Sequence, residues 1–206
     1  MNRWTPGHST ALTRTPIVAL NFHEIIPEHR PEVLRSLRHV AAMGPRYDPD
    51  EPGPFDGPRV FVAFYDGMRD AALFGAEECA NLGLKAYFFP LFDHYDAELA
   101  NVTDDEWRQI ATVHEIGFHT ASHAAVTEVT QRTVQREVID PMVRIEGIAG
   151  YRPRIGAWKG GSRFDPGLVG DQTARAYGVR FLVSNWSIER VPPEGAGSGP
   201  ADHRPG

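Results

Sequence analysis

Residues 113–123 read VHEIGFHTASH, and this stretch holds three of the nine histidines of the chain. His119 and His123 lie four positions apart, a spacing that places both imidazoles on one side of a helix. A loop that leaves a strand and folds over can bring them together in the same way. Two neutral imidazoles that point to one place are a usual beginning of a zinc site, which also needs a third ligand, often a carboxylate, and an open position for water.

The sequence around this stretch predicts the strands and helices that hold it. Residues 115–118 are expected to form a short strand that delivers His119 at its end, and other apolar runs predict strands at residues 17–22, 60–64, 86–89, 154–158 and 180–184. Apolar residues at helical spacing predict helices at residues 33–41, 69–82, about 130–148 and 171–177, and the capping box Thr103-Asp-Asp-Glu106 predicts another. Pro141 predicts a kink or a break in the longest of these helices. Because strands and helices alternate, the fold class is α/β with a largely parallel sheet.

Six such strands fit either an open doubly wound sheet or an incomplete (β/α) barrel. In both architectures, ligands collect at the carboxyl ends of the parallel strands. Polar residues follow several of the predicted strands, namely Asp66, Asp93 and His94, His119, and Lys159. We therefore expect Asp66 to approach His119 and His123 and to supply the missing carboxylate.

The composition is that of a soluble globular protein with one domain. We expect a flexible lead-in at residues 1–16, the α/β domain at residues 17–190, and a disordered tail rich in glycine and proline at residues 191–206. The net charge of −6 argues against a nucleic-acid partner, and the single cysteine, Cys79, excludes a disulfide framework. No run resembles a signal peptide or approaches the roughly 18 apolar residues of a membrane span. These features predict a cytoplasmic protein without a membrane partner, and they leave the oligomeric state open.

Two motifs carry a resemblance to a known family. The first is Ala63-Phe-Tyr65-Asp66-Gly67 at the end of a predicted strand, and the second is Glu115-Ile-Gly-Phe-His119-Thr-Ala-Ser-His123. With these motifs the chain resembles the polysaccharide deacetylase family, the NodB homology domain of carbohydrate esterase family 4, from about Val18 to Trp186. The resemblance implies an incomplete or distorted (β/α) barrel.

The resemblance also assigns the metal ligands. In the family, the second aspartate of the first motif and both histidines of the second motif bind a divalent metal, which implies Asp66, His119 and His123 here. Zn²⁺ is the expected ion, with Co²⁺, Ni²⁺ or Mn²⁺ as alternatives. Such an ion polarises an amide carbonyl and makes hydroxide available near neutral pH.

The chain departs from the family at the residues that move protons. The family's catalytic base is the first aspartate of the first motif, and Tyr65 stands in its place. A phenol with a pKa of about 10 is a poor proton acceptor at neutral pH, although it can donate a hydrogen bond. The residues considered as replacement bases are Asp93, His94, His23 and Glu115, and of these Glu115 is expected to be structural because it opens a strand at the opposite end. The family's third motif is only loosely matched by residues 152–161, which leaves Arg152 and Arg154 as alternatives for its arginine.

Three functions are compatible with this sequence. The first is a metal-dependent deacetylase that cleaves the C–N amide bond of an N-acetylated sugar or a related small molecule. The second is a non-catalytic relative that binds metal and carbohydrate but lacks the usual aspartate base. The third is an α/β domain whose histidines are incidental. We favour the first, with a small-molecule or carbohydrate substrate.

Overall fold

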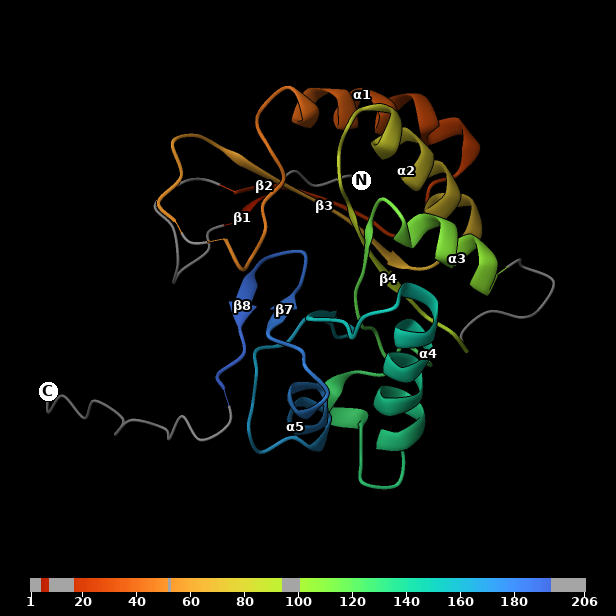
Figure 1. Ribbon diagram of the computed structural model, residues 1–206, viewed down its shortest axis with the longest axis vertical. Coiled ribbons are helices and arrows are strands. Elements are labelled where there is room, and N and C mark those ends of the chain that lie inside the picture. Colours follow the sequence, from red (N-terminus) through yellow and green to blue (C-terminus); the bar gives the residue numbers. More distant parts are fainter. Residues whose placement is uncertain (1–4, 8–16, 52, 94–100, 194–206) are drawn as a thin grey trace, which may run out of the picture.

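A run of parallel strands forms the centre of the computed structural model, which describes residues 5–7, 17–51, 53–93 and 101–193 (Figure 1). One sheet has the order β1-β2-β3-β4-β5, with bounds Thr5–Gly7, Ile17–Phe22, Arg59–Asp66, Tyr87–Pro90 and Glu115–Ile116. Strands β2 to β5 are parallel, and β1 pairs antiparallel with β2. A second sheet contains β6 (Ile155–Ala157), β7 (Phe181–Val183) and β8 (Ile188–Arg190). The two sheets are continuous, because Phe118 pairs with Gly156 in parallel between β5 and β6.

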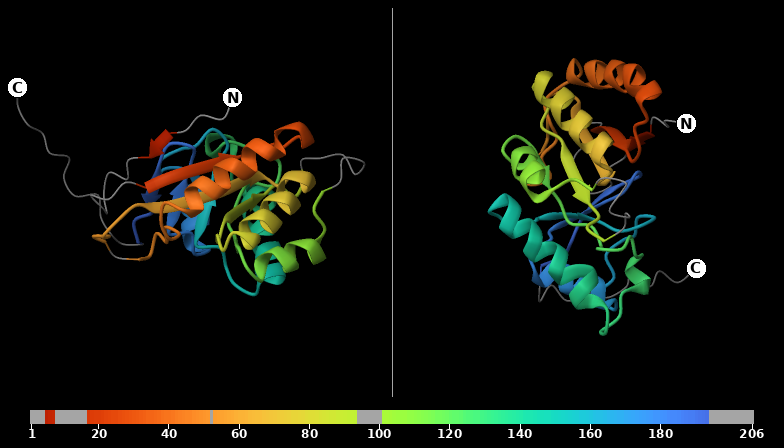
Figure 2. Two further views of the ribbon diagram at one scale, coloured as in Figure 1. Left: turned by 90° about the horizontal axis from the view of Figure 1, so that it is seen from above. Right: turned by 90° about the vertical axis from the view of Figure 1, so that its right-hand side faces the viewer.

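Helices cover the outer face of these strands. They are α1 (Arg30–Ala41), α2 (Arg69–Asn81), α3 (Asp104–Ala111), α4 (Asp140–Ala149) and α5 (Val169–Ala176), with short 3₁₀ turns at Pro27–His29 and Val126–Glu128. Figure 2 shows α1, α2, α3 and α4 following one another along one side of the sheet. No helix in the described ranges is long and apolar enough to cross a membrane.

The residues of each strand alternate between two apolar layers, as the pleat of a β-strand requires. In β3, Val62 and Phe64 face the helices and belong to the outer core, where Phe64 stacks on Phe88. Phe61, Ala63 and Tyr65 face the other way, into a cluster with residues of β4, β6 and β7. A buried layer on the concave side, shared by both sheets, is the interior of a barrel.

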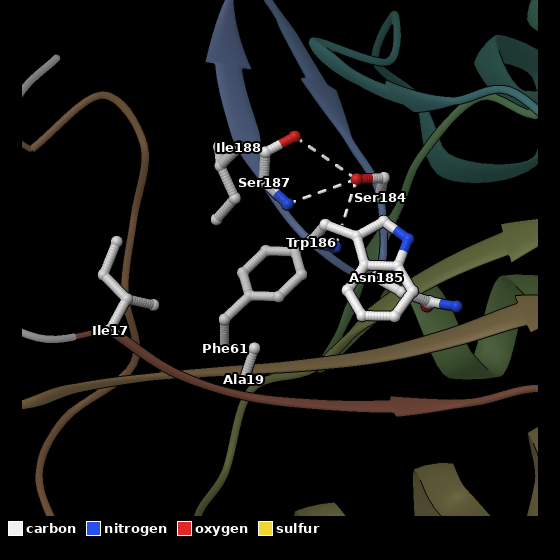
Figure 3. Close-up of a pocket in the computed structure, with 8 residues that line it drawn as sticks. All are labelled: Ile17, Ala19, Phe61, Ser184, Asn185, Trp186, Ser187 and Ile188. Atoms are coloured by element: carbon white, nitrogen blue, oxygen red, sulfur yellow. Dashed lines mark hydrogen bonds between the residues drawn. The ribbon is translucent and has the colours of Figure 1, made fainter. Parts of the chain in front are cut away.

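The barrel is open between its first and last parallel strands. Among the described residues, no backbone pairing joins β2 to β7 or β8. Figure 3 shows that the gap is lined by side chains instead: Ile17, Ala19 and Phe61 lie opposite the turn that contains Trp186 and ends at Ile188. The fold is thus an α/β fold with a parallel sheet curved into a distorted, incomplete barrel, as the sequence predicted.

Three local expectations were wrong. Residues 5–7 form a strand rather than part of a flexible lead-in, because their backbone pairs with β2. The six predicted strands omit β8, which follows residues 180–184 and returns antiparallel along β7. Val191, assigned to the tail, is buried, and its N–H donates to the carbonyl of Arg180 at 2.8 Å. The rest of the predicted lead-in and tail, at residues 1–4, 8–16 and 194–206, lies outside the described residues.

The longest predicted helix is interrupted at the predicted place. A π-helical segment, Gln135–Ile139, leads directly into α4, where Pro141 occupies the first turn. Proline has no N–H to donate to the carbonyl four residues earlier, so an α-helix cannot continue regularly through it. The expectation of a break at Pro141 is confirmed, and it takes the form of a π-bulge, a feature found often at functional sites.

Candidate metal centre

Asp66 is the last residue of β3 and presents its carboxylate at the carboxyl end of the sheet. It pairs with Pro90 of β4, which fixes its depth in the barrel. Its φ of 67° and that of Gly67, also 67°, turn the chain sharply after the strand. A left-handed conformation is strained for a residue other than glycine and clusters at functional sites. The turn aims the side chain of Asp66 at the loop that follows the neighbouring strands.

His119 and His123 lie on a tight loop, not on a helix. Phe118 anchors the start of the loop, because its N–H donates to Ile155 at 2.9 Å and its carbonyl accepts from Ala157 at 2.8 Å. The hydroxyl of Thr120 donates to the carbonyl of Ala124 at 3.0 Å and closes the loop across its base. His123 has a φ of 61°, the second left-handed residue other than glycine in the described chain.

These elements bring Asp66, His119 and His123 together. Oδ1 of Asp66 lies 3.8 Å from Nε2 of His119 and 3.5 Å from Nε2 of His123. One ligand atom from each of the three residues lies within 4.8 Å of the others. This convergence is the one that the sequence predicted for the metal ligands.

The donor set fits a divalent metal. Oδ1 of Asp66 is buried and has no hydrogen-bond partner among the described residues, although leaving a buried carboxylate oxygen unpaired is costly. A cation between this oxygen and the two imidazoles would provide the missing partner. One carboxylate and two imidazoles, with room for further ligands on the open side, match the ligand types of catalytic zinc sites.

His23 holds the other oxygen of Asp66. Its Nδ1 lies 3.0 Å from Oδ2, and its Nε2 lies 3.5 Å from Nδ2 of Asn185. The hydrogen bond with Asp66 raises the pKa of His23, and burial opposes this shift. Burial also pushes the pKa of Asp66 upward, but the hydrogen bond from His23 and the three neighbouring imidazoles outweigh it and hold that pKa below its ordinary value. The carboxylate is therefore ionised and oriented at neutral pH.

A cavity of about 200 Å³ opens above these residues. Its walls combine the candidate ligands Asp66, His119 and His123 with His23 and Tyr65, and further lining residues come from the end of β7 and from the loops after β6 and β7. These residues are the buried Trp158 and Val183 and, on the rim, Lys159, Gly160, Gly161, Ser184, Asn185 and Trp186. Trp186 is 57% exposed, and its backbone N–H donates to Oγ of Ser184, which holds the turn in place (Figure 3). An aromatic and polar cavity over a cluster of metal-ligand types is a default candidate for a binding or active site.

Comparison with known proteins agrees with this geometry. The family model described as polysaccharide deacetylase matches residues 54–182. The chain belongs to the polysaccharide deacetylase family. No match to the sequence is found among curated proteins.

Solved structures of deacetylases share the fold at low sequence identity. IcaB from Ammonifex degensii has a TM-score of 0.68 and 16% identity, with 95% of this chain and 91% of that chain covered. The deacetylase PplD of Streptococcus pyogenes, solved in complex with acetate, has a TM-score of 0.62 and 16% identity, with 79% of this chain and 80% of that chain covered. A polysaccharide deacetylase from Bacillus cereus has a TM-score of 0.63 and 17% identity, with 81% of this chain and 56% of that chain covered.

The residue at the family's base position, Tyr65, lines the cavity but is not placed to act as a base. It is 4% exposed and lies between two rings, those of His23 and Phe89, each with its centroid 5.0 Å away. Its hydroxyl donates to Oδ1 of Asn21 at 3.2 Å. Burial, and then the charge of Asp66, raise the pKa of Tyr65 above its ordinary value. The phenol therefore stays protonated, in line with the expectation that Tyr65 is a poor proton acceptor at neutral pH.

Of the other residues considered as replacement bases, Asp93 does not line this cavity in the described structure. Asp93 lines a neighbouring cavity of about 120 Å³, where Nε of Arg136 donates to its carboxylate at 3.3 Å. The chain after β4 turns Asp93 away from the candidate metal ligands, so the structure does not favour its assignment as a replacement base. His94 lies outside the described residues.

The arginines considered for the family's third motif lie away from the cavity. Arg154 precedes β6 at the amino end of the barrel, where it binds Glu115 and Asp48, and Arg152 pairs with Glu146 at 3.1 Å. Glu115 is buried in this ion-pair network, as expected for a structural residue. The cation that the cavity does contain on its rim is Lys159.

Sequence reasoning missed two residues near the centre. Asn185 lies on the rim beside His23, and nothing in its local pattern distinguishes it from a turn asparagine. Glu137 is 5% exposed and accepts hydrogen bonds from Ser122, which lies between the two candidate histidine ligands. A signal for Glu137 was present in the sequence, because Pro141, four residues later, frees its backbone carbonyl for a partner outside the helix.

Proposed function

We propose that this chain is a divalent-metal-dependent deacetylase that hydrolyses the amide bond of an N-acetylated sugar. The observation that carries the proposal is the buried Oδ1 of Asp66, which faces His119 and His123 and has no hydrogen-bond partner among the described residues. The position of these three residues beneath a cavity, in a chain of the polysaccharide deacetylase family, supports a hydrolytic site rather than a structural one.

Asp66, His119 and His123 would hold the metal, with Zn²⁺ as the ion that best fits one carboxylate and two imidazoles. When bound, such an ion polarises an amide carbonyl and lowers the pKa of water. The protein's own contribution is orientation. His23 fixes Oδ2 of Asp66, so Oδ1 is left to face the histidines. Loss of outer partners of this kind typically lowers metal affinity or activity by about 10- to 100-fold.

His23 is the residue that we propose for proton transfer. Of the residues considered as replacement bases that the structure describes, His23 lines the cavity and Asp93 and Glu115 do not. When its Nδ1–H donates to Asp66, its Nε2 keeps a lone pair that faces Asn185 and the cavity. In this proposal, Nε2 exchanges its contact with Asn185 for water, takes a proton from it and returns one to the leaving amine, as an imidazole oriented by a carboxylate can do.

The substrate class follows from the cavity and the relatives. Deacetylation of an N-acetylated sugar releases acetate, and one solved deacetylase with this fold contains acetate. Trp186 is a largely exposed indole on the rim, suited to stacking on the apolar face of a sugar ring. Lys159 and the amides of Gly160 and Gly161 lie on the same rim and can donate hydrogen bonds to sugar hydroxyls.

One observation favours a second candidate, a non-catalytic metal- and carbohydrate-binding relative. The family's base is absent, and the buried tyrosine in its place cannot supply it. If His23 does not transfer protons, the site binds metal and sugar without hydrolysis.

The test begins with the metal content and affinity of the wild-type protein and of His119→Ala. His39→Ala is the matched control, because His39 is exposed on α1. We expect about one divalent metal per chain in the wild type and in the control, and loss of binding in His119→Ala. Acetate release is then measured with N-acetylglucosamine and its short oligomers, for the wild type and for His23→Gln.

Each outcome decides between the candidates. Acetate release that requires His119 and falls by at least about 100-fold in His23→Gln supports the deacetylase with His23 in proton transfer. Metal and sugar binding without acetate release supports the non-catalytic relative. Absence of metal from the wild type after incubation with Zn²⁺ would refute both.

A further inference from the structure

The loop that carries His119 and His123 is held from outside by the helix that precedes α4. Only three residues separate the two histidines, so the loop is too short to be stabilised by contacts among its own residues alone. Two of them, Ala121 and Ser122, are bound through the same residue, Glu137, on the π-helical segment. The two histidines and this segment are distant in sequence but adjacent in the fold.

The side chain of Glu137 accepts hydrogen bonds from Ser122. One carboxylate oxygen accepts the backbone N–H of Ser122 at 3.1 Å, and both oxygens lie within 3.0 Å of its hydroxyl, at 2.9 and 3.0 Å. Glu137 is 5% exposed, so these bonds form where water does not compete for them. The guanidinium of Arg136 lies 3.8 Å from the same carboxylate and partly compensates its charge.

The backbone carbonyl of Glu137 binds Ala121. The N–H of Ala121 donates to the carbonyl of Glu137 at 3.2 Å. In a regular α-helix this carbonyl would accept from the residue four positions later, which here is Pro141 and has no N–H. The proline and the π-bulge thus direct a helix carbonyl to the loop between the two metal ligands.

The result is that consecutive N–H groups of Ala121 and Ser122 are both bound to one residue. Two adjacent backbone groups held in this way fix the direction of the chain immediately before His123, whose left-handed φ of 61° is unfavourable without such support. The carbonyl of Ala121 is held from the other side by the N–H of Asp93 at 3.0 Å.

We propose that Glu137 is a positioning residue for the metal centre, and that Pro141 enables this role by freeing the Glu137 carbonyl. Glu137 sets the distance and angle between His119 and His123 and thereby the affinity of the site for its metal. The inference rests on the metal site of the proposed function and adds to it a residue that touches neither metal nor substrate.

The test compares four variants with the wild type. Glu137→Gln and Ser122→Ala weaken the side-chain contact, Pro141→Ala restores a helix N–H that competes with Ala121 for the Glu137 carbonyl, and Glu146→Gln is the matched control on α4. Glu146 is paired with Arg152 on the surface and does not contact the loop. Zn²⁺ affinity is measured by competition with a chelator, the visible absorption of the Co²⁺ form reports ligand geometry, and unfolding in EDTA reports the stability of the metal-free fold.

We expect Zn²⁺ affinity to fall about 10- to 100-fold in Glu137→Gln, Ser122→Ala and Pro141→Ala, the range typical of groups that orient metal ligands. The Co²⁺ spectrum should change in the same three variants and not in Glu146→Gln. Pro141→Ala separates positioning from fold stability, because alanine favours a helix and should leave the metal-free protein at least as stable as the wild type.

The inference is overturned if all three variants that fold bind Zn²⁺ with the affinity and Co²⁺ spectrum of the wild type. It is also overturned if their affinities fall only in proportion to a loss of metal-free stability. Should Glu137→Gln fail to fold, Ser122→Ala and Pro141→Ala decide the question. Absence of metal from the wild type would instead refute the proposed function.

Discussion

Two of the three candidate metal ligands, Asp66 and His123, have a backbone conformation that residues other than glycine rarely adopt. Each such residue costs on the order of 1–3 kcal/mol, and the surrounding structure must offset that cost. Asp66 is held by pairing to β4 and by His23, and the loop before His123 is held by Glu137. The strain is located at the residues that converge, which is typical of a functional site rather than of a solvated histidine pair.

At the residue scale, the first prediction concerns Tyr65→Phe. Because the phenol is buried and its pKa is raised, its proton is not available for exchange at neutral pH. We expect kcat/KM for acetate release to stay within about threefold of the wild type, and the free energy of unfolding to fall by about 1 kcal/mol because Asn21 loses a donor. Activity assays and denaturant unfolding measure the two effects.

Tyr87→Phe is the control, since it removes another buried hydroxyl, which donates to the carbonyl of Tyr47 at 2.9 Å. If Tyr65→Phe loses activity by a factor of 100 while Tyr87→Phe does not, Tyr65 has a catalytic role that its surroundings do not explain.

At the element scale, α3 shows how a local sequence signal forms a helix end. The hydroxyl of Thr103 accepts from the N–H of Glu106 at 3.2 Å, and the carboxylate of Glu106 accepts from the N–H of Thr103 at 2.9 Å. Arg69 of α2 also binds this carboxylate. The capping box that the sequence predicted is therefore also a link between two helices.

The second prediction concerns the pH dependence of this link. The Arg69 guanidinium, together with the Thr103 N–H, lowers the pKa of Glu106 from 4.5 to about 2. A carboxylate with a lowered pKa stabilises the fold above its ordinary pKa, and the stabilisation disappears as the pH falls toward the folded value. We expect Glu106→Gln to unfold more readily than the wild type at pH 7, by at most about 1 kcal/mol because solvent screens this partly buried pair. This difference should vanish between pH 4.5 and about 2.

A double-mutant cycle with Arg69→Met identifies the partner. If the ion pair is responsible, the double variant loses less free energy of unfolding than the sum of the losses in the two single variants. If the wild type and Glu106→Gln differ in free energy of unfolding by the same amount from pH 7 to pH 2, the ionised Glu106 carboxylate is not the cause.

At the scale of the whole molecule, the two ends of the barrel have different roles. The carboxyl ends of the strands hold the candidate metal centre and its cavity. At the amino ends, Arg154 before β6 binds Glu115 of β5 and the loop residues Asp48 and Asp50. This network ties a long loop to both sheets. In barrels of this kind, the amino end typically serves stability and the carboxyl end serves chemistry.

The third prediction tests this division. Among the described residues, Arg154→Ala leaves the buried Glu115 with Arg46 as its remaining ion-pair partner, and breaking such a pair is strongly destabilising. We expect the free energy of unfolding to fall by about 3 kcal/mol, while Zn²⁺ affinity, measured under conditions where the protein is folded, stays that of the wild type.

Arg152→Ala is the control, because its pair with Glu146 is exposed and should contribute less than about 1 kcal/mol. A loss of Zn²⁺ affinity in Arg154→Ala without a loss of stability would show that the two ends are not independent.

The sequence by itself determined the features that depend on short-range patterns. Apolar runs and helical spacing specified the alternation of strands and helices, and the family motifs specified Asp66, His119 and His123. These succeed because a strand's apolar run and a ligand's position at its end are encoded within a few consecutive residues. Tyr65 was identified as a poor base from its chemistry, and its burial strengthens that conclusion.

Only the tertiary structure decided which residues support the metal centre. His23 reaches Asp66 across 43 positions, and Glu137 reaches the histidine loop across 15, while Asp93, close to a predicted strand end, is turned toward Arg136. Strand β8 forms because the turn after β7 brings its backbone back to pair. The physical reason is the same in each case: a hydrogen bond between distant residues depends on side-chain direction and on unpaired backbone groups in the folded chain, and neither leaves a periodic pattern in the sequence.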